Sequence, residues 1–515
     1  MVMKKPKLNT AQLAIILAVM TLLSKLLGFV RELFLASNFG TGYITDSYVM
    51  AVSIPNNLLS NIMAAAMTAY LPIFSQKVER SVEEGLKFTR QLVNFLLCLT
   101  GAAAVLGGVF AKQIVAFLAP GYSAEAIALT VFYTRIAFIM VIFSSFTQII
   151  GGYLQYKGVF IPQNIFAYSQ NIFIIAAIII SAKSGIPELL IFGIAAGYVV
   201  MGLGTLLLSS RYGYSHKFDF DFTDSVKDVV YLAIPVFIGN SLSEINALVD
   251  RSLASNLQEG SVSALYYGNI CSVVVLGLTV TIFVTIIYPK IIKAFSLQEY
   301  EKVSEISEKG INLIVMLMLP MTLGAMLYSN QAIQVVFERG AFQEAATSLT
   351  ASAFFYYSIG MAFNGVRNLL DKVFFAAHDS KTPVICSGIS IAINIILNLL
   401  LVKPMAHAGL ALATSISNIV ATVLLYVMFK KKFPEITLLS SFKKIGKIAL
   451  FSVISVGLSY VFYYFVGNAI WMPRMVLLGL AVLVACVIYY IFLYIARFEE
   501  LDLVKDMIFR RNKEA

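Results

Sequence analysis

The chain has 515 residues, of which 59% are hydrophobic and 13% are charged, and its formal net charge is +10. Soluble domains average about 45–50% apolar and about 25% charged residues, so this composition excludes a soluble protein and predicts one large helical membrane domain. Four separated cysteines, three scattered histidines and the lack of a phosphate-binding loop or nucleophile elbow in the sequence argue against a metal centre, an ATP-driven pump and a hydrolase.

Apolar segments long enough to cross a bilayer recur along the whole chain. A hydrocarbon core of about 30 Å requires roughly 20 mostly apolar residues per helix. The first segment contains Lys25 and Arg31 and lacks a small-residue cleavage site, so it predicts a retained helix rather than a signal peptide. We expect fourteen spans, at residues 11–36, 47–75, 86–111, 127–154, 160–182, 186–209, 227–257, 263–292, 306–336, 347–377, 383–402, 407–430, 443–466 and 471–496.

Basic residues are concentrated in alternate connections between these spans. Placing the N-terminus inside puts the lysine run at 430–432 and the basic tail in the cytoplasm. The positive-inside rule therefore predicts that both termini are cytoplasmic, and it accounts for the net charge without a nucleic-acid partner. The outer connections then hold only five basic residues, namely Lys112, Lys183, Arg339, Lys403 and Arg474.

The first two spans resemble the seventh and eighth. Residues 34–38 (FLASN) match 252–256 (SLASN), and the Tyr-Leu-Pro at 70–72 is followed at a similar offset by the Tyr-Pro at 288–289. Charged pairs precede both copies of the first motif. Six helices separate the copies, so both enter the membrane in the same direction. This arrangement predicts a parallel repeat with a transport site between two lobes that rock against each other.

We therefore expect an all-α integral membrane protein with about 14 transmembrane helices, in two pseudo-symmetric six-helix lobes plus two C-terminal helices. The predicted N-lobe covers residues 1–210 and the C-lobe covers 211–432. Residues 433–515 then form the thirteenth and fourteenth spans and a basic tail.

Ionisable side chains inside the spans mark candidate functional positions, because each costs at least about 2.5–3.5 kcal/mol at the bilayer centre. Lys25 and Glu32 lie seven residues apart, nearly two helical turns, and share a face of the first span. Arg31 beside them offers a planar fork of donors for a phosphate, with Glu32 as its counter-ion. The alternative role for these charges is an ion pair that joins two helices.

Three further charged residues are candidates for a substrate cavity or a gate. Asp46 lies at a loop-to-helix junction, where capping of the second helix is the alternative role. Asp250 and Arg251 occur at the equivalent depth in the second copy of the repeat. Four other embedded charges are interpreted as structural or interfacial: Arg135, Arg367, Asp371 and Lys372.

Several stretches of the chain, taken in order, resemble the MurJ (MviN) family. The likeness covers essentially the whole sequence, including the number of spans. It rests on SKLLGFVRE at 24–32, Thr45-Asp46, Ile54-Pro55-Asn56, VFERGAF at 336–342, DSKTPV at 379–384 and HAGLALATS at 407–415.

This resemblance implies a member of the multidrug/oligosaccharidyl-lipid/polysaccharide exporter superfamily. Such proteins flip lipid II, the undecaprenyl-pyrophosphate-linked peptidoglycan precursor, from the inner to the outer leaflet of the bacterial plasma membrane for cell wall synthesis. By position, Arg31, Glu32 and Lys25 correspond to the family's cationic cavity, and Asp46 to its acidic loop residue. The resemblance further implies membrane lipids and cell-envelope enzymes as partners, and a groove for the lipid tail at spans thirteen and fourteen.

Two positions depart from the family pattern. Relatives carry basic residues near the positions of Leu59 and Ile270, which are apolar here, so the cavity offers fewer cations to a pyrophosphate. Arg135 and Arg251 are the residues that could replace them. A flippase for another undecaprenyl-pyrophosphate-linked glycan, such as an exopolysaccharide repeat unit, therefore stays an alternative.

Other functional classes fit the residues less well. A cation-coupled drug exporter would have to bind small cations beside a cationic first span, and an inactive scaffold would tolerate any substitution in the cavity. An enzyme is not expected, because no nucleophile–base pair is apparent. We expect no metal and no cofactor. The membrane potential, worth about 2.3 kcal/mol per charge per 100 mV, or an ion gradient would drive transport.

Overall fold

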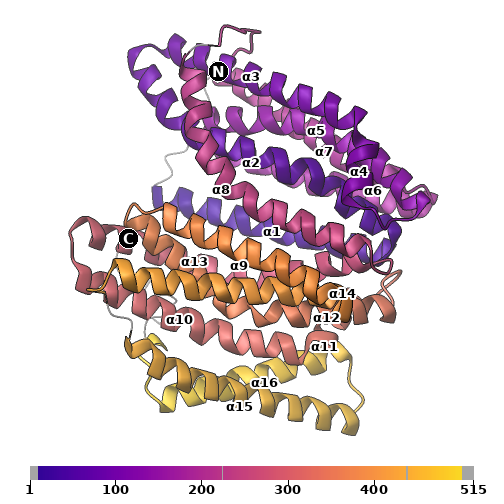
Figure 1. Cartoon of the computed structure of the whole chain (residues 1–515), viewed down its shortest axis with the longest axis vertical. Coiled ribbons are helices and arrows are strands. Elements are labelled where there is room, and N and C mark those ends of the chain that lie inside the picture. Colours follow the sequence, from indigo (N-terminus) through magenta and orange to yellow (C-terminus); the bar gives the residue numbers. More distant parts are fainter. Residues whose placement is uncertain (1–9, 223, 437–438, 502–515) are drawn as a thin grey trace. The chain divides into compact units, whose positions relative to one another are not determined.

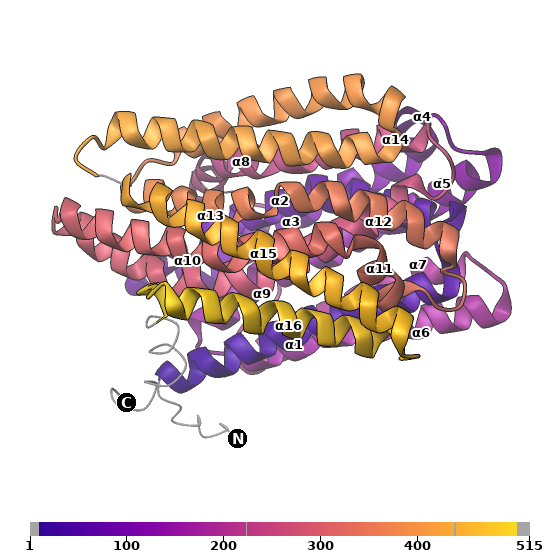
Figure 2. The same cartoon turned by 90° about the horizontal axis from the view of Figure 1, so that it is seen from below.

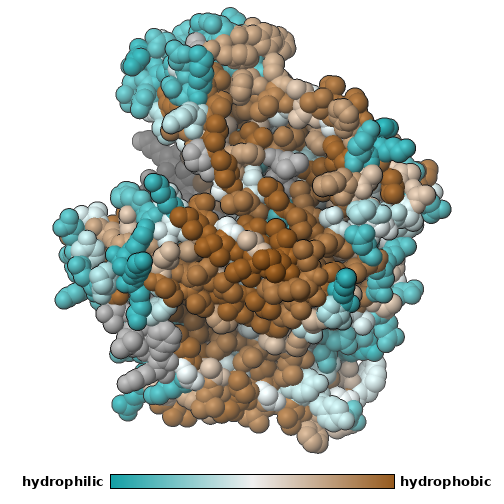
Figure 3. All heavy atoms as spheres, in the orientation of Figure 1, coloured by the Kyte–Doolittle hydropathy of each residue, from teal (hydrophilic) through white to brown (hydrophobic). Residues whose placement is uncertain are grey.

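The computed structural model describes residues 10–222, 224–436 and 439–501, and every regular element in this part is a helix (Figure 1). Eight of the described helices are long and apolar enough to cross a membrane, or nine when a bent pair in α8 counts as one span. The face over α14 is hydrophobic along the middle of the helix halves and hydrophilic near their ends (Figure 3). The protein is an all-α, multi-pass membrane protein.

The chain forms two compact units, and the first contains residues 1–263 and 339–343. In it, α2 packs on α5 and α8, α3 packs on α5, and α6 packs on α1 and α7. Its apolar core includes an aromatic cluster in which Tyr70 stacks on Phe74 and Phe88. Its helices are α1 (Thr10–Phe39), α2 (Tyr43–Arg80), α3 (Val82–Val109), α4 (Ala111–Leu118), α5 (Ala124–Tyr156), α6 (Ile161–Ser184), α7 (Leu189–Arg211) and α8 (Asp224–Ser255).

The second unit contains residues 264–338 and 344–515. Its apolar core lies among α9, α10, α13 and α14, and α15 packs on α10 and on α16 (Figure 2). Its helices are α9 (Ser261–Ser296, which begins in the first unit), α10 (Tyr300–Leu327), α11 (Ser329–Phe337), α12 (Glu344–Ile359), α13 (Met361–Ala376), α14 (Lys381–Lys432), α15 (Leu439–Ala469) and α16 (Arg474–Ile495).

Each of the fourteen predicted spans falls on helical residues, the ninth on both α10 and α11. The short helices α4 and α11 were not predicted as separate elements, and the tenth span is divided at Gly360 into α12 and α13. The eleventh and twelfth spans both lie in α14, which is kinked at Ala406, shortly after Pro404. Ser390 donates a hydrogen bond of 2.7 Å to the carbonyl oxygen of Ser417 across this kink. The two halves of α14 are therefore separate spans that pack on each other.

The helix boundaries confirm the internal repeat. α2 begins at Tyr43 and α9 at Ser261, an offset of 218 residues, and the starts of α3 and α10 and of α4 and α11 have the same offset. After α11 the offset becomes 220, as between Ala124 and Glu344. The repeats thus run in register, with α15 and α16 as the additional C-terminal pair. The lobe limits at residues 210 and 432 stay a prediction.

Candidate functional site

Arg31 and Glu32 form an ion pair on α1. Nε of Arg31 donates a hydrogen bond of 2.9 Å to Oε1 of Glu32, and Nη2 contacts the same oxygen. Nη1 of Arg31 donates to Oδ1 of Asn171 on α6, at 3.3 Å. Glu32 is only 3% exposed, whereas Arg31 is half-buried. The guanidinium therefore neutralises a buried carboxylate and also joins two helices.

Lys25 lies apart from this pair. Its side chain is exposed and has no hydrogen-bond or ion-pair partner among the residues that the structure describes. Because a helix has 3.6 residues per turn, Lys25 lies on nearly the same face of α1 as Glu32, but about two turns away along the helix axis. A contribution of Lys25 to a common site stays a prediction.

Asp250 occupies the position in α8 that Glu32 occupies in α1, because the two lie at the repeat offset. Both carboxylates are buried, with Asp250 9% exposed. Arg251 follows it, and Nη1 of Arg251 is buried without a hydrogen-bond acceptor in the described part of the chain. Arg251 interacts electrostatically with Glu244 and with Tyr122. The repeat therefore carries an acidic position in each copy, each beside an arginine.

Asp46 caps a helix, although not the one considered from the sequence. The N-cap of α2 is Gly42, which has no side-chain cap. The carboxylate of Asp46 instead accepts hydrogen bonds from the backbone N–H groups of Gly260 (2.8 Å) and Ser263 (2.7 Å), at the start of α9. The first N–H groups of a helix lack partners inside it, so this carboxylate satisfies two donors of the other repeat.

Glu259 makes the reciprocal contact. Its Oε1 accepts a hydrogen bond of 2.9 Å from the backbone N–H of Tyr43, the first residue of α2. Each repeat therefore supplies a carboxylate to the helix start of the other. A small cavity of about 160 Å³ adjoins these contacts and is lined by Asp46, Tyr122 and Glu259, among others.

Glycines allow two further close approaches between the repeats. A Cβ on Gly121 would lie 2.3 Å from the carbonyl oxygen of Ser255, and a Cβ on Gly340 would lie 2.2 Å from that of Ser37. Ser37 and Ser255 are themselves equivalent in the repeat, and the N–H of Ala341 donates to the Ser37 oxygen at 2.8 Å. We call the turns at 40–42, 119–123, 256–260 and 339–343 the interlock.

The other embedded charges have structural surroundings. Arg135 donates to the Gly108 carbonyl oxygen at 3.3 Å and is exposed. Arg367 on α13 donates to Ser387 (2.7 Å) and Asn418 (3.2 Å), one on each half of α14. Asp371 lies 3.9 Å from the Nε of Arg367. These contacts agree with the interpretation of Arg367 as a structural residue.

Leu59, one of the two positions where the resemblance leads us to expect a cation, lies in an apolar cluster with Met50, Ile54 and Leu248. Ile270 is half-buried. The structure therefore provides apolar surroundings at the first of these positions. Within the residues that the structure describes, no cluster of three or more His, Cys, Asp or Glu side chains is arranged to hold a metal ion.

Sequence reasoning missed several residues of this region. Asn171 is one of several amide side chains in the apolar spans, and its pairing with Arg31 has no sequence signal. Glu259 and Gly121 could have been found from the aligned repeat. It places Glu259 in the turn that matches the one before α2, and Gly121 in the turn that matches the end of the VFERGAF stretch at 336–342.

The fold and its paired buried charges define a class, the polytopic α-helical transporters built from two six-helix repeats. A solved MATE family multidrug transporter of the MOP superfamily, in an inward-facing conformation, superposes with a TM-score of 0.62 at 13% identity and covers 80% of this chain and 95% of its own. A solved lipid II flippase MurJ in an inward closed conformation superposes with a TM-score of 0.82 at 24% identity, covering 95% and 100%.

The family model described as "Lipid II flippase MurJ" matches residues 35–495, so the chain belongs to the MurJ family. The probable lipid II flippase MurJ of Rickettsia prowazekii is 29% identical over 78% of this chain and 80% of its own. The corresponding protein of Rhizobium tropici is 25% identical over 96% and 95%.

Proposed function

We propose that this chain flips lipid II from the inner to the outer leaflet of the bacterial plasma membrane, for cell wall synthesis. The observation that carries the proposal is the family match over residues 35–495. That match begins just after Arg31 and Glu32, so the roles of these two residues rest on their geometry. Both termini lie in the cytoplasm in this proposal, in line with the distribution of basic residues.

Arg31 is the proposed ligand of the substrate pyrophosphate. Its guanidinium is half-buried and bonded to one oxygen of Glu32, so an incoming phosphate can take over donors that Glu32 now occupies. Oε2 of Glu32 is buried and has no hydrogen-bond partner in the described part of the chain. Glu32 thus holds Arg31 in place while the site is empty, and Asp250 provides the equivalent acid in the other repeat.

The interlock supports transport by alternating access. Reciprocal caps and glycine contacts close the two repeats at one end of the first unit. With the N-terminus inside, this closed end faces outward. Release of the substrate to the outer leaflet then requires these contacts to break, and a substrate that binds the open state more tightly biases the equilibrium towards it. Movement of net charge across the membrane potential is the proposed driving force.

A different undecaprenyl-pyrophosphate-linked glycan is the second candidate substrate. The observation that favours it is the burial of Leu59 in an apolar cluster, which leaves fewer cations for a pyrophosphate. Cell-envelope enzymes are proposed partners in either case, because the glycan must be made on one side of the membrane and used on the other.

Rescue of a bacterium depleted of its own lipid II flippase tests the proposal. We expect the wild-type chain to restore growth and Arg31→Ala to fail at equal membrane abundance. Failure of a well-expressed wild type would contradict lipid II as the substrate and favour the second candidate. Full rescue by Arg31→Ala would remove Arg31 from the substrate site.

A further inference from the structure

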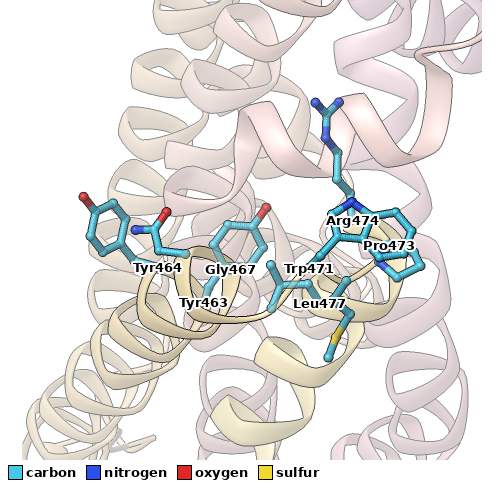
Figure 4. A pocket seen from close by; sticks show the side chains of 9 residues that line it. Tyr463, Tyr464, Gly467, Trp471, Pro473, Arg474 and Leu477 are labelled. Atoms are coloured by element: carbon cyan, nitrogen blue, oxygen red, sulfur yellow. The ribbon is translucent and has the colours of Figure 1, made fainter.

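A cavity of about 490 Å³ opens at the turn between α15 and α16 (Figure 4). Its walls include Tyr463 from the end of α15, Trp471 from the turn, and Arg474 and Leu477 from the first turn of α16. The indole of Trp471 lies beside Pro473 and Arg474 (Figure 4). Proteins bind small ligands in cavities of about 300–1,000 Å³, so this one is large enough for a lipid headgroup.

Arg474 is a weakly engaged cation. Its Nη1 lies 3.5 Å from Oε1 of Glu338, its one partner among the residues that the structure describes. That carboxylate already accepts shorter hydrogen bonds from Gln334 (3.0 Å) and Thr347 (2.8 Å). The side chain of Arg474 is 66% exposed. Most of its donors are therefore available to an anion.

The start of α16 favours an anion at the same place. Pro473 is its N-cap and provides no side-chain cap, and Arg474 is the first helical residue. The N–H groups of Val476 and Leu477 donate to the carbonyl oxygen of Pro473, which leaves those of Arg474 and Met475 directed out of the helix start with their partial positive charge. A phosphate combines readily with both features, because arginine can bind two of its oxygens at once.

The surroundings of the cavity are those of a membrane interface. Trp471 is 92% exposed, and Ile470 and Met475 beside it are exposed as well. α15 and α16 both have the length and hydropathy of membrane spans, and Lys444 and Lys447 lie at the opposite end of α15. Aromatic side chains and cations at the end of a span are typical of the headgroup level.

We propose that this cavity binds the phosphate of an anionic phospholipid, with Arg474 and the start of α16 holding the phosphate and Trp471 lying against the glycerol region. The binding does not depend on the transport proposal. Only its assignment to the outer leaflet rests on the orientation proposed above.

The experiment uses Trp471, which is the only tryptophan of the chain, so the intrinsic tryptophan emission reports on this cavity alone. The full-length protein in maltoside detergent is titrated with phosphatidylglycerol that carries brominated acyl chains, which quench indole emission on contact. Brominated diacylglycerol, which has the same chains but no phosphate, is titrated in parallel. We expect quenching by the phosphatidylglycerol to reach saturation. Quenching by the diacylglycerol should not saturate.

Two variants separate the cavity from general charge effects. Arg474→Gln removes the cation and should weaken phosphatidylglycerol binding about tenfold, a change of about 1.4 kcal/mol. Lys403→Gln removes another exposed basic residue that does not line the cavity and should leave binding unchanged. Equal quenching by both lipids, or unchanged binding in Arg474→Gln, would overturn the proposal. Displacement of the phosphatidylglycerol by a lower concentration of undecaprenyl phosphate would also overturn it, because the site would then belong to the prenyl carrier.

Discussion

The ion pair between Arg31 and Glu32 on α1 has two roles to be distinguished, stabilisation of the fold and binding of the substrate. Glu32 is almost fully buried and Arg31 supplies its counter-charge, so the pair could stabilise the fold, bind the substrate, or do both. Breaking a buried pair by removing one partner costs about 3–5 kcal/mol, because the other charge is left uncompensated. Loss of function in a single variant is therefore ambiguous on its own.

A double substitution resolves this ambiguity. We expect Arg31→Ala to lower the unfolding midpoint in detergent, whereas Arg31→Gln combined with Glu32→Gln should recover most of it, since no buried charge remains unpaired. Transport, measured by rescue of the depleted strain, should stay lost in the double variant. Recovery of growth together with stability would show that the pair is only structural.

The capping contacts of Asp46 lead to a second prediction for a single residue. Asp46→Asn retains one oxygen acceptor but places an amide donor against the other N–H group, so either Gly260 or Ser263 loses its acceptor. An unsatisfied buried donor costs about 1–3 kcal/mol, which we expect to see as a lower unfolding midpoint. Asp221→Asn is the control, because Asp221 is exposed and lies 3.8 Å from Lys87. Equal midpoints in the two variants would contradict a capping role.

At the scale of elements, the two halves of α14 are joined at their ends. Asp379 precedes the first half, and its carboxylate accepts hydrogen bonds from the N–H (3.0 Å) and hydroxyl (2.7 Å) of Thr382. Lys432, the last residue of the second half, contacts Asp379 and donates to the hydroxyl of Thr382 at 2.7 Å. The start of one span and the end of the next therefore share one polar network.

This network gives a pH-dependent prediction. Partial burial raises the pKa of Asp379, but the hydrogen bonds from Lys432 and Thr382 outweigh it and lower the pKa from 3.8 to about 2. The network should therefore contribute stability above about pH 4 and lose it as the pH falls towards 2. We expect Lys432→Gln to have a lower unfolding midpoint than the wild type at pH 7, with the difference shrinking below pH 4. Lys430→Gln, at an exposed neighbour, should match the wild type throughout.

The elements were largely predictable, since hydrophobic length alone predicted helical residues at each of the fourteen positions. The breaks at Gly360 and Ala406 fall where Gly and Pro interrupt apolar runs, but only the second was predicted, as a boundary between two spans. The sequence paired Arg31 with its neighbour Glu32, as the structure does, but it gave no partner from a distant part of the chain. Arg31 and Asn171 lie 140 residues apart, and helix packing rather than sequence spacing brings them together.

At the scale of the whole molecule, closure at the interlock depends on backbone approach that only glycine permits. Gly121→Ala would place a methyl group 2.3 Å from the carbonyl oxygen of Ser255 and 2.5 Å from the Cα of Asn256, neither of which can move aside as a side chain can. The closed state should be destabilised relative to the open one, so transport should fall. Gly101→Ala is the matched control, because the methyl group that it adds would have no neighbouring atom within 4 Å outside its own helical turn.

Two measurements check this prediction. Rescue of the depleted strain should be impaired by Gly121→Ala and not by Gly101→Ala. Spin labels on the turns at 119–123 and 256–260 should report a longer mean distance in Gly121→Ala. An unchanged distance distribution would mean that the interlock tolerates the methyl group and does not set the conformational balance.

The reciprocal caps also bear on how such a chain could be divided. If it were cut in the connection between α7 and α8, the N-terminal fragment would lack Glu259 at the start of α2, and the C-terminal fragment would lack Asp46 at the start of α9. Each fragment would then lack the carboxylate that accepts from its helix N–H groups in the intact chain. We therefore expect two separately made fragments to reassemble through these reciprocal caps, without the peptide link between the halves.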